Sequence, residues 1–449
     1  MKRLSLFVLF LLLRHMASGD VFKDGETVCF LGDSITHGGR FHSIVYDYYL
    51  TRYPERTIRF VNAGVSGDSA GGALGRLTED VVDKKPTSVA VMFGMNDVNR
   101  GSYVADPDAQ KKSVQQGALD GYKKNMEALV GRIRSEAAEP SLLFVTPSPF
   151  DQTGVNDRNN NQPGCNDGLS RCAELVKALA GKNSATVVDF HGPMTAFNLE
   201  RQKADPAYTI IGPDRVHPGA PGHLMMAWLF LKAQGAPALV SRVVVDAAAG
   251  RATESANATV TAVAKKDGAW GFTVLEKALP FPVDEAAKSI LTQLPIEQDL
   301  DQETLAVTGL ATGTYELLID GVPVGRYTAA ELAKGINLAF NAATPQYKQA
   351  QAVAMLNETR RSTESALRNY AAVRWFLKHR QVNPDDLAAV KAFAETKMNK
   401  TGFYEGKVAD YLTNWPRRGE VSAKVAALEQ QLFAARQPVA HATVVRPVQ

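Results

Sequence analysis

From Thr27 onward, short apolar runs alternate with longer amphipathic segments, and this alternation constrains the fold more than any other feature of the sequence. Strands are expected at 27–31, 58–61, 88–93, 142–146 and 186–190. Helices are expected at 41–53, 73–82, 116–133, 168–180 and 219–231. Strands separated by helices form βαβ units, whose parallel sheet is covered by helices on both faces. We therefore predict an α/β domain over residues 20–238.

The alternation of strands and helices stops after about residue 240. Strand-like runs follow one another without helices between them, at 242–245, 258–263, 271–275, 305–308 and 315–319. Asp320-Gly321 is a typical hairpin turn. These patterns predict a β-rich accessory domain over 239–344. The charged, Ala- and Gln-rich segment that follows predicts a helical C-terminal region over 345–449, with a loose tail after Pro438.

The first 19 residues have the pattern of a signal peptide rather than of a folded element. Lys2 and Arg3 precede an apolar run from Leu4 to Leu13, interrupted by Ser5, and Ala17-Ser18-Gly19 offers small residues for cleavage. The run is shorter than a membrane-spanning helix requires, and no later segment is apolar enough to span. We expect cleavage after Gly19 and a periplasmic or secreted protein, with an uncleaved membrane anchor as the alternative.

Charge and cysteine content exclude several classes of protein. Lys plus Arg number 50 and Asp plus Glu 47, so no basic surplus points to a nucleic-acid partner. No Cys/His spacing typical of zinc is present, and we predict no metal site. Export makes disulfides possible, and Cys165 and Cys172, seven residues apart in a polar segment, could pair. Cys29 lies in an apolar strand and is expected to be a buried thiol.

Four short polar segments lie where an active site is expected in a parallel sheet, beyond strand ends or before a helix. They are Gly32-Asp33-Ser34, Asn62-Ala63-Gly64-Val65-Ser66-Gly67, Gly94-Met95-Asn96-Asp97 and Asp214-Arg215-Val216-His217. A serine just past a strand can point its hydroxyl into a cleft and its N–H at a developing oxyanion. A glycine N–H and an asparagine amide can donate to the same oxyanion. An Asp and a His three residues apart can hydrogen-bond, so that the Asp orients the imidazole that takes the serine proton.

In this order the four segments resemble those of the SGNH hydrolases, also called GDSL-type esterases, over about Phe30 to Leu231. The resemblance implies a three-layer, flavodoxin-like α/β/α fold and a mechanism without cofactor or metal. It implies that Ser34 is the nucleophile, His217 the base and Asp214 its orienting acid. The amides of Ser34 and Gly67 and the side chain of Asn96 then form the oxyanion hole. Ile35 replaces the leucine of the family's name motif.

Two alternatives accompany this interpretation. Gly67-Asp68-Ser69-Ala70-Gly71 also matches the nucleophile elbow of α/β-hydrolases, which would make Ser69 the nucleophile. The elbow would come only about 50 residues into the mature chain, after too few strands for that fold. Alternatively, Ser34 is a helix N-cap and His217 a surface residue. Beside the triad, Asp97 and Arg215 are candidates for substrate contact. The alternative for Asp97 is a hydrogen bond that caps a helix or fixes its loop, and the alternative for Arg215 is a surface ion pair.

The segments around Ser34 and Asn96 are polar, which favours a small acyl group on a hydrated alcohol such as a sugar. Exported SGNH-type enzymes with added β domains resemble carbohydrate esterases that remove acetyl groups. We therefore predict an exported carbohydrate O-acetylesterase whose partner is a small-molecule or glycan ester. The alternatives are a general carboxylesterase or lysophospholipase of the same fold, and a glycan-binding protein with a vestigial triad.

Overall fold

The computed structural model describes residues 21–397 and 404–448. The expected signal peptide, residues 1–19, lies outside these residues. Among the helices of this described part, none is both long and apolar enough to cross a bilayer.

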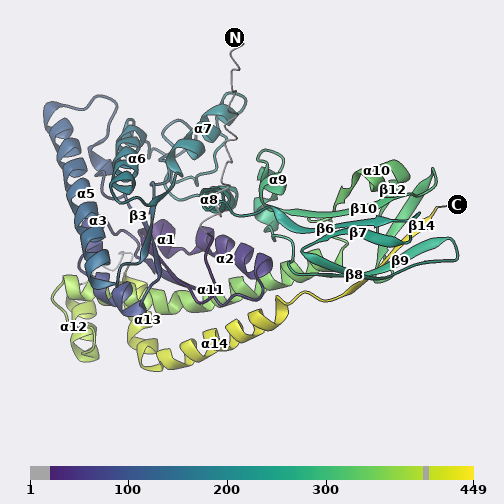
Figure 1. Cartoon of the computed structure of the whole chain (residues 1–449). Coiled ribbons are helices and arrows are strands. Elements are labelled where there is room, and N and C mark those ends of the chain that lie inside the picture. Colours follow the sequence, from purple (N-terminus) through teal and green to yellow (C-terminus); the bar gives the residue numbers. More distant parts are fainter. Residues whose placement is uncertain (1–20, 398–403, 449) are drawn as a thin grey trace, which may run out of the picture.

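The N-terminal domain is built on a sheet of five parallel strands (Figure 1). The strands are β1 (Thr27–Gly32), β2 (Arg59–Gly64), β3 (Ser88–Met92), β4 (Ser141–Val145) and β5 (Thr186–Val188). Their order in the sheet is β2-β1-β3-β4-β5, the order of flavodoxin-like folds. The predicted fold class is therefore confirmed.

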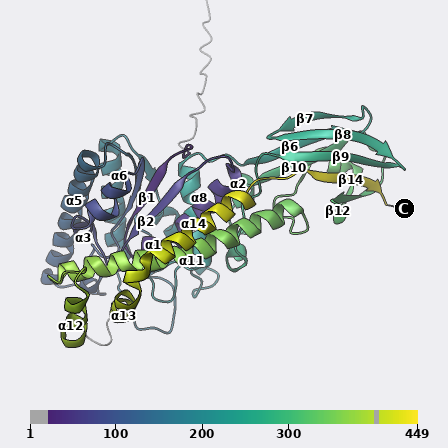
Figure 2. The ribbon, with the colours of Figure 1, turned by 90° about the horizontal axis from the view of Figure 1, so that it is seen from below.

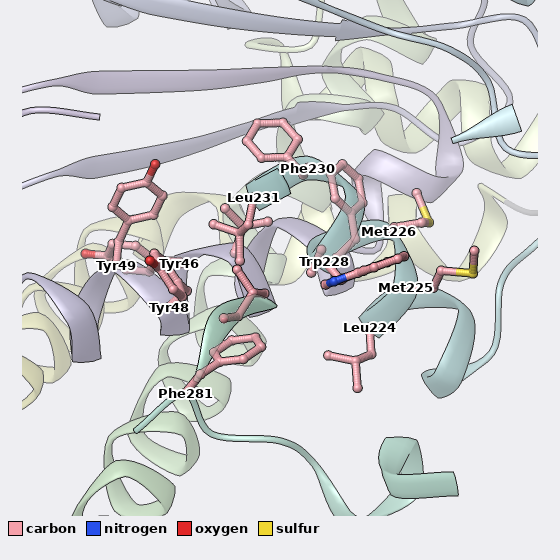
Figure 3. Close-up of a cluster of buried hydrophobic side chains, with 14 of the residues drawn as sticks. Tyr46, Tyr48, Tyr49, Leu224, Met225, Met226, Trp228, Phe230, Leu231 and Phe281 are labelled. Atoms are coloured by element: carbon pink, nitrogen blue, oxygen red, sulfur yellow. The ribbon is translucent and has the colours of Figure 1, made fainter. Parts of the chain in front are cut away.

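Helices cover both faces of this sheet. They are α1 (Ser34–His37), α2 (Arg40–Arg52), α3 (Ala70–Ala73), α4 (Leu77–Asp80), α5 (Ala109–Glu136), α6 (Cys165–Lys182), α7 (His191–Gln202) and α8 (Ala220–Ala233). Successive residues of a strand point to opposite faces, and in β1 both sets are buried. Phe30 packs in the cluster formed with α2 and α8, while Leu31 packs in the cluster formed with α5 and α6. Figure 3 shows part of the first cluster, in which the tyrosines of α2 meet the apolar side chains of α8 and Phe281.

The strand order reverses between β1 and β3, so the connections after β1 and β3 leave the sheet in opposite directions. In open parallel sheets a crevice forms at this point, outside the carboxyl ends of the strands. Ser34 begins α1 directly after β1. Gly64, at the end of β2, lies so close to α1 that a Cβ there would be 2.2 Å from the His37 backbone nitrogen. The glycine thus permits the close packing of the two segments beside the crevice.

The disulfide expectation is wrong. Helix α6 begins at Cys165, three residues earlier than expected, and therefore carries both Cys165 and Cys172. Seven residues along a helix correspond to about 10 Å, whereas bridged cysteines need Cα atoms within about 7 Å. Cys29, Cys165 and Cys172 are free, buried thiols.

Two further sheets form a β-rich lobe beside the N-terminal domain (Figure 1). One contains β6 (Leu239–Asp246), β7 (Arg251–Ala256), β10 (Gln302–Thr308) and β13 (Ile336–Asn337). The other has the order β12-β11-β14-β9-β8, with β8 (Ala258–Lys266), β9 (Ala269–Glu276), β11 (Thr314–Ile319), β12 (Val322–Thr328) and β14 (His441–Pro447). Apolar residues of both sheets share one core. Short helices α9 (Ile296–Leu300) and α10 (Ala329–Lys334) complete the segment, and β11 and β12 form the hairpin expected at Asp320-Gly321.

The C-terminal region is helical until its last strand. Helix α11 (Pro345–His379) leads away from the β lobe beneath the N-terminal domain, and α14 (Arg418–Ala435) returns beside it (Figures 1 and 2). Helices α12 (Leu387–Lys397) and α13 (Glu405–Asn414) lie between them in the chain. The expectation of a loose tail after Pro438 is wrong, because β14 pairs with both β9 and β11. The domain boundaries at 238 and 344 stay predictions.

Candidate active site

The structure brings Ser34, His217 and Asp214 together in one chain of hydrogen bonds. Ser34 Oγ lies 2.7 Å from His217 Nε2, and His217 Nδ1 lies 2.5 Å from Asp214 Oδ2. A carboxylate can only accept, so Nδ1 carries the imidazole proton and Nε2 accepts from the serine hydroxyl. This is the proton arrangement in which an imidazole can act as a base toward a serine.

Local backbone geometry fixes the acid beneath the imidazole. Asp214 Oδ1 accepts hydrogen bonds from the amides of Val216 and His217, both at 3.0 Å. Partial burial raises the pKa of Asp214, but the hydrogen bonds from the His217 ring and from the two amides outweigh it and hold the pKa below its ordinary value. Asp214 is therefore ionised at neutral pH and can stabilise a protonated imidazole.

The base side of the site is open to solvent. The side chain of His217 is 49% exposed and that of Asp214 is 44% exposed. Ser34 is half-buried, and Asp33 caps its helix by accepting from the Ile35 amide at 3.0 Å. Burial raises the pKa of Asp33 to about 6. An exposed base leaves room for a bulky alcohol on the leaving-group side.

Two of the expected oxyanion donors lie on loops that touch each other. Gly67 has a positive φ of 80°, and a Cβ at this position would meet no atom within 4 Å, so its backbone faces open space. Asn96 Nδ2 donates to the Asp68 carbonyl at 2.8 Å, which leaves its second N–H for another acceptor. Ser34 is the first residue of α1, where N–H groups have no acceptor within the helix. The three donors named from the sequence thus follow the carboxyl ends of β1, β2 and β3, which are neighbours in the sheet.

Asp97 holds the loop of Asn96 rather than facing a ligand. Its two oxygens accept from the amides of Ala70 and Gly94, at 2.9 and 3.0 Å. Burial raises the pKa of Asp97 to about 7. These bonds tie the loop after β3 to the start of α3. The alternative of a loop hydrogen bond therefore describes Asp97 better than substrate contact.

Arg215 likewise uses its side-chain donors for hydrogen bonds within the protein. Its expected role as a substrate contact is therefore corrected. Its side chain is buried, and Nη1 donates to the carbonyls of Asp151 and Gly154, both at 2.7 Å. Nε donates to Asn160 Oδ1 at 2.9 Å. Arg215 thus anchors the Asn-rich loop 151–164 to the loop that carries His217.

Ser69, the alternative nucleophile, has a structural role. Its Oγ accepts from the Gly72 amide at 3.2 Å and caps α3. Among the described residues, no His forms a hydrogen bond with this hydroxyl. Over the same part of the chain, no three His, Cys, Asp or Glu side chains gather as metal ligands.

A buried ionic network beneath the Gly67 loop was missed by the sequence analysis. Arg76 Nε donates to Asp68 Oδ2 at 2.7 Å, and Arg76 Nη1 donates to Asp80 Oδ2 at 2.8 Å. Arg368, from α11, donates to the same Asp80 oxygen at 2.8 Å. Two arginines outweigh the effect of burial and lower the pKa of Asp80 to about 2.

The loop itself receives two more contacts at Ser66. His37 Nδ1 accepts from the Ser66 amide at 3.1 Å, and the Tyr404 hydroxyl donates to the Ser66 carbonyl at 3.2 Å. Burial lowers the pKa of His37 to about 3, so this imidazole stays neutral. Local sequence patterns could not predict that Arg368 and Tyr404 contact this region, because both lie about 300 positions further along the chain.

Comparison with known proteins places this site in a family. The model of the GDSL-like lipase/acylhydrolase family matches residues 30–225. The acetylxylan esterase of Geobacillus stearothermophilus is 30% identical over 226 residues, which cover 47% of this chain and 94% of that protein. An uncharacterized lipoprotein, YqeF of Bacillus subtilis strain 168, is 25% identical over 147 residues, covering 31% of this chain and 57% of the lipoprotein.

One solved structure extends the similarity to the whole architecture. A gut microbial diltiazem-metabolizing enzyme is 32% identical, with a TM-score of 0.89, and the match covers 96% of this chain and 99% of that one. The β lobe and the C-terminal helices are therefore shared with that enzyme. Together with the family match, these similarities show that the chain belongs to the GDSL-like lipase/acylhydrolase family and is an ester hydrolase.

Proposed function

We propose that this protein is a carbohydrate O-acetylesterase that works through an acyl-enzyme on Ser34. The observation that carries the proposal is the pair of short contacts from Ser34 Oγ to His217 Nε2 and from His217 Nδ1 to Asp214. A neutral imidazole accepting from a serine hydroxyl, with an ionised acid behind it, is the arrangement that activates a serine nucleophile.

The steps follow from these contacts. Ser34 Oγ attacks the acyl carbonyl carbon while His217 Nε2 takes the hydroxyl proton. The carbonyl oxygen becomes an oxyanion, stabilised by the N–H groups of Ser34 and Gly67 and by Asn96 Nδ2. When the tetrahedral intermediate collapses, His217 gives its proton to the departing alcohol. Water, deprotonated by the same imidazole, then attacks the carbonyl carbon of the acyl-enzyme. The second tetrahedral intermediate collapses, His217 returns the proton to Ser34 Oγ, and the carboxylic acid leaves.

The substrate class rests on the openness of the site and on the relatives. The exposed His217 lies where the alcohol must leave, so the alcohol can be large and hydrated. One relative, matched over most of its length, is an acetylxylan esterase. The relative whose structure matches the whole chain metabolizes diltiazem. We take an acetylated glycan as the substrate. We also propose that the protein is exported, on the basis of residues 1–19.

The test compares Ser34→Ala with Ser69→Ala, which removes the serine of the alternative elbow. Hydrolysis of 4-nitrophenyl acetate should be lost in Ser34→Ala and retained in Ser69→Ala. The reverse result would transfer the nucleophile to Ser69. Retention of activity in both variants would contradict the proposed acyl-enzyme.

The acyl and alcohol specificities need separate assays. Rates on 4-nitrophenyl esters from acetyl to octanoyl should fall with chain length, and a rise would favour the lysophospholipase alternative. Acetate release should be screened on acetylated xylan, pectin and sialic acids. Glycan binding with no turnover of any ester would favour a binding protein with a vestigial triad.

A further inference from the structure

A cavity of about 460 Å³ lies between the N-terminal domain and the C-terminal helix α11. Arg40 from α2, Ala220 and His223 from α8, and Met355 and Glu358 from α11 contribute to its walls. Figures 1 and 2 show α11 passing beneath α1 and α2, far in sequence from either. A volume of this size lies within the range of pockets that bind small molecules.

The cavity begins next to the base of the site. Ala220 follows His217 by three residues, so their Cα atoms lie within about 11 Å of each other. Arg40 follows the short helix α1 that starts at Ser34. A substrate whose acyl carbon is held at Ser34 has its alcohol on the side of His217, which must protonate it. The alcohol is therefore the part of the substrate that can reach the cavity.

The lining combines an aliphatic wall with polar groups. Leu224, Val283 and Met355 contribute apolar surface, and Met355 is 72% exposed at the α11 side. Arg40 makes no hydrogen bond or ion pair with another residue in the described ranges, so its guanidinium donors are available. Aliphatic surface can cover the C–H face of a ring while charged and amide groups bind its hydroxyls.

His223 forms part of the cavity wall. Its side chain is buried, yet Nδ1 has no hydrogen-bond partner among the described residues. Burial lowers the pKa of His223 to about 3, so the ring is neutral. The same burial keeps Nδ1 out of contact with solvent, so His223 contributes a neutral ring surface to the cavity wall rather than a hydrogen-bonding atom.

We propose that this cavity is the subsite for the alcohol side of the ester, a neutral hydroxylated ring such as a sugar. The inference rests on the proposed function and deepens it. It means that α11, which lies outside the segment shared with the GDSL-like family model, takes part in choosing the substrate. A purely apolar acyl chain would meet the Arg40 guanidinium and the Glu358 carboxylate.

The test uses the substitution Met355→Trp, whose larger side chain should narrow the cavity at its exposed side. Ala352→Trp is the matched control, because Ala352 is exposed on the same helix but does not line the cavity. The measured quantity is the ratio of kcat/KM for acetylated xylobiose to kcat/KM for 4-nitrophenyl acetate. Met355→Trp should lower this ratio about tenfold, mainly through KM, while Ala352→Trp leaves it within about twofold. An unchanged ratio in Met355→Trp would overturn the subsite.

A binding measurement separates failure of the subsite from failure of the proposed function. Ser34→Ala is titrated calorimetrically with xylobiose, alone and combined with Met355→Trp. Weaker binding in the double variant supports the subsite even if the wild type releases acetate from no glycan, a result that would end only the esterase proposal. Equal binding in both proteins, or no binding in either, overturns the subsite. Arg40→Met, which removes the available donors, should weaken xylobiose binding in the same assay.

Discussion

The two sides of the site are held in place by different parts of the chain. In the base loop (residues 214–217) the Asp–His pair is oriented locally, since Asp214 accepts from two amides of its own loop and from the ring of His217. Arg215 additionally ties this loop to the segment 151–160. The oxyanion loop (residues 64–68) is held from a distance, by Arg76 and by α11 and the segment before α13. The Asp–His pair can therefore be oriented without the C-terminal helices, whereas the oxyanion loop needs those helices in place.

The Asp214–His217 pair and the ionic network under the oxyanion loop also differ in exposure, and this changes what a substitution should do. Both side chains of the base loop pair are nearly half exposed, so changing them removes chemistry and costs little stability. The network under the oxyanion loop is buried, with Arg76 and Asp68 side chains 3% and 0% exposed. Removing one partner there leaves another charge in a poorly solvated place. Activity and stability should therefore separate on the base side and fall together on the oxyanion side.

The largest expected effect, on the base side, is that of Asp214→Asn. Loss of the charge removes the acid that orients and stabilises the imidazolium, and kcat on 4-nitrophenyl acetate should fall about 10⁴-fold. The free energy of unfolding in urea should change by less than about 0.5 kcal/mol. A loss of kcat below tenfold would contradict the assigned role.

Asp320→Asn is the matched control for this substitution. Asp320 Oδ2 lies 2.6 Å from His441 Nδ1, so it forms an Asp–His pair of similar geometry in the β lobe. Its replacement should leave kcat unchanged. A comparable loss of kcat in the control would show that the effect of Asp214→Asn is not specific to the base loop.

On the oxyanion side, Asn96→Ala removes one proposed donor to the oxyanion. One such donor contributes about 3–4 kcal/mol to the transition state, so kcat should fall about 10²–10³-fold, less than for Asp214→Asn. KM should change little, because the charge develops only in the transition state. A rise in KM with unchanged kcat would instead indicate a role in ground-state binding.

Arg368→Met tests whether the C-terminal helix supports the oxyanion loop. Asp80 keeps Arg76 as a partner, so the free energy of unfolding should fall by about 1–3 kcal/mol rather than more. kcat should fall as well, while the pH dependence of kcat/KM, which reports the base, keeps its midpoint. Lys378→Met is the control. Lys378 lies on the same helix as Arg368, and its replacement removes an exposed ion pair with Glu79 of α4. Equal stability of both variants would break the comparison between the two sides.

The extent to which the sequence predicts this molecule follows the same division. The five parallel strands and the loops after them could be located because apolar runs and Gly, Ser or Asn turns are local signals. Ser34, Asp214 and His217 were named for the same reason, and the structure brings them into contact. Helix α7 was missed because it begins at His191, directly after the residues assigned to the last strand.

What the sequence could not predict depends on distant partners. Strand β14 buries His441, Thr443 and Val445, so two of its three inward residues are polar and the apolar alternation is weak. It becomes a strand because β9 and β11 pair with it. Arg368 lies on a charged helix, and its buried partners, Asp80 and the Asn62 carbonyl, lie about 300 positions earlier in the chain. Periodicity reports one element at a time and cannot reveal such pairings.

The last substitution tests the contact between α2 and α11, where the effect on stability depends on pH. Asp47 is buried, its Oδ1 accepts from Asn357 Nδ2 at 2.7 Å, and burial raises its pKa to about 8 from 3.8. Between these pH values the folded protein binds a proton that the unfolded chain does not. Stability from this group is therefore fully present below about pH 4 and is lost as pH rises toward 8, by up to ~1.4 kcal/mol per pH unit.

Asp47→Asn removes this titration, so the stability of the variant relative to wild type should increase steadily from pH 5 to pH 8. Urea unfolding at pH 5, 6.5 and 8 measures the difference, and exposed Asp83→Asn controls for the chemical change itself. A difference that stays constant with pH would mean that Asp47 is ionised in the folded protein. The contact between α2 and α11 would then hold a buried charge, and the coupling of the C-terminal helix to the N-terminal domain would not change between pH 5 and pH 8.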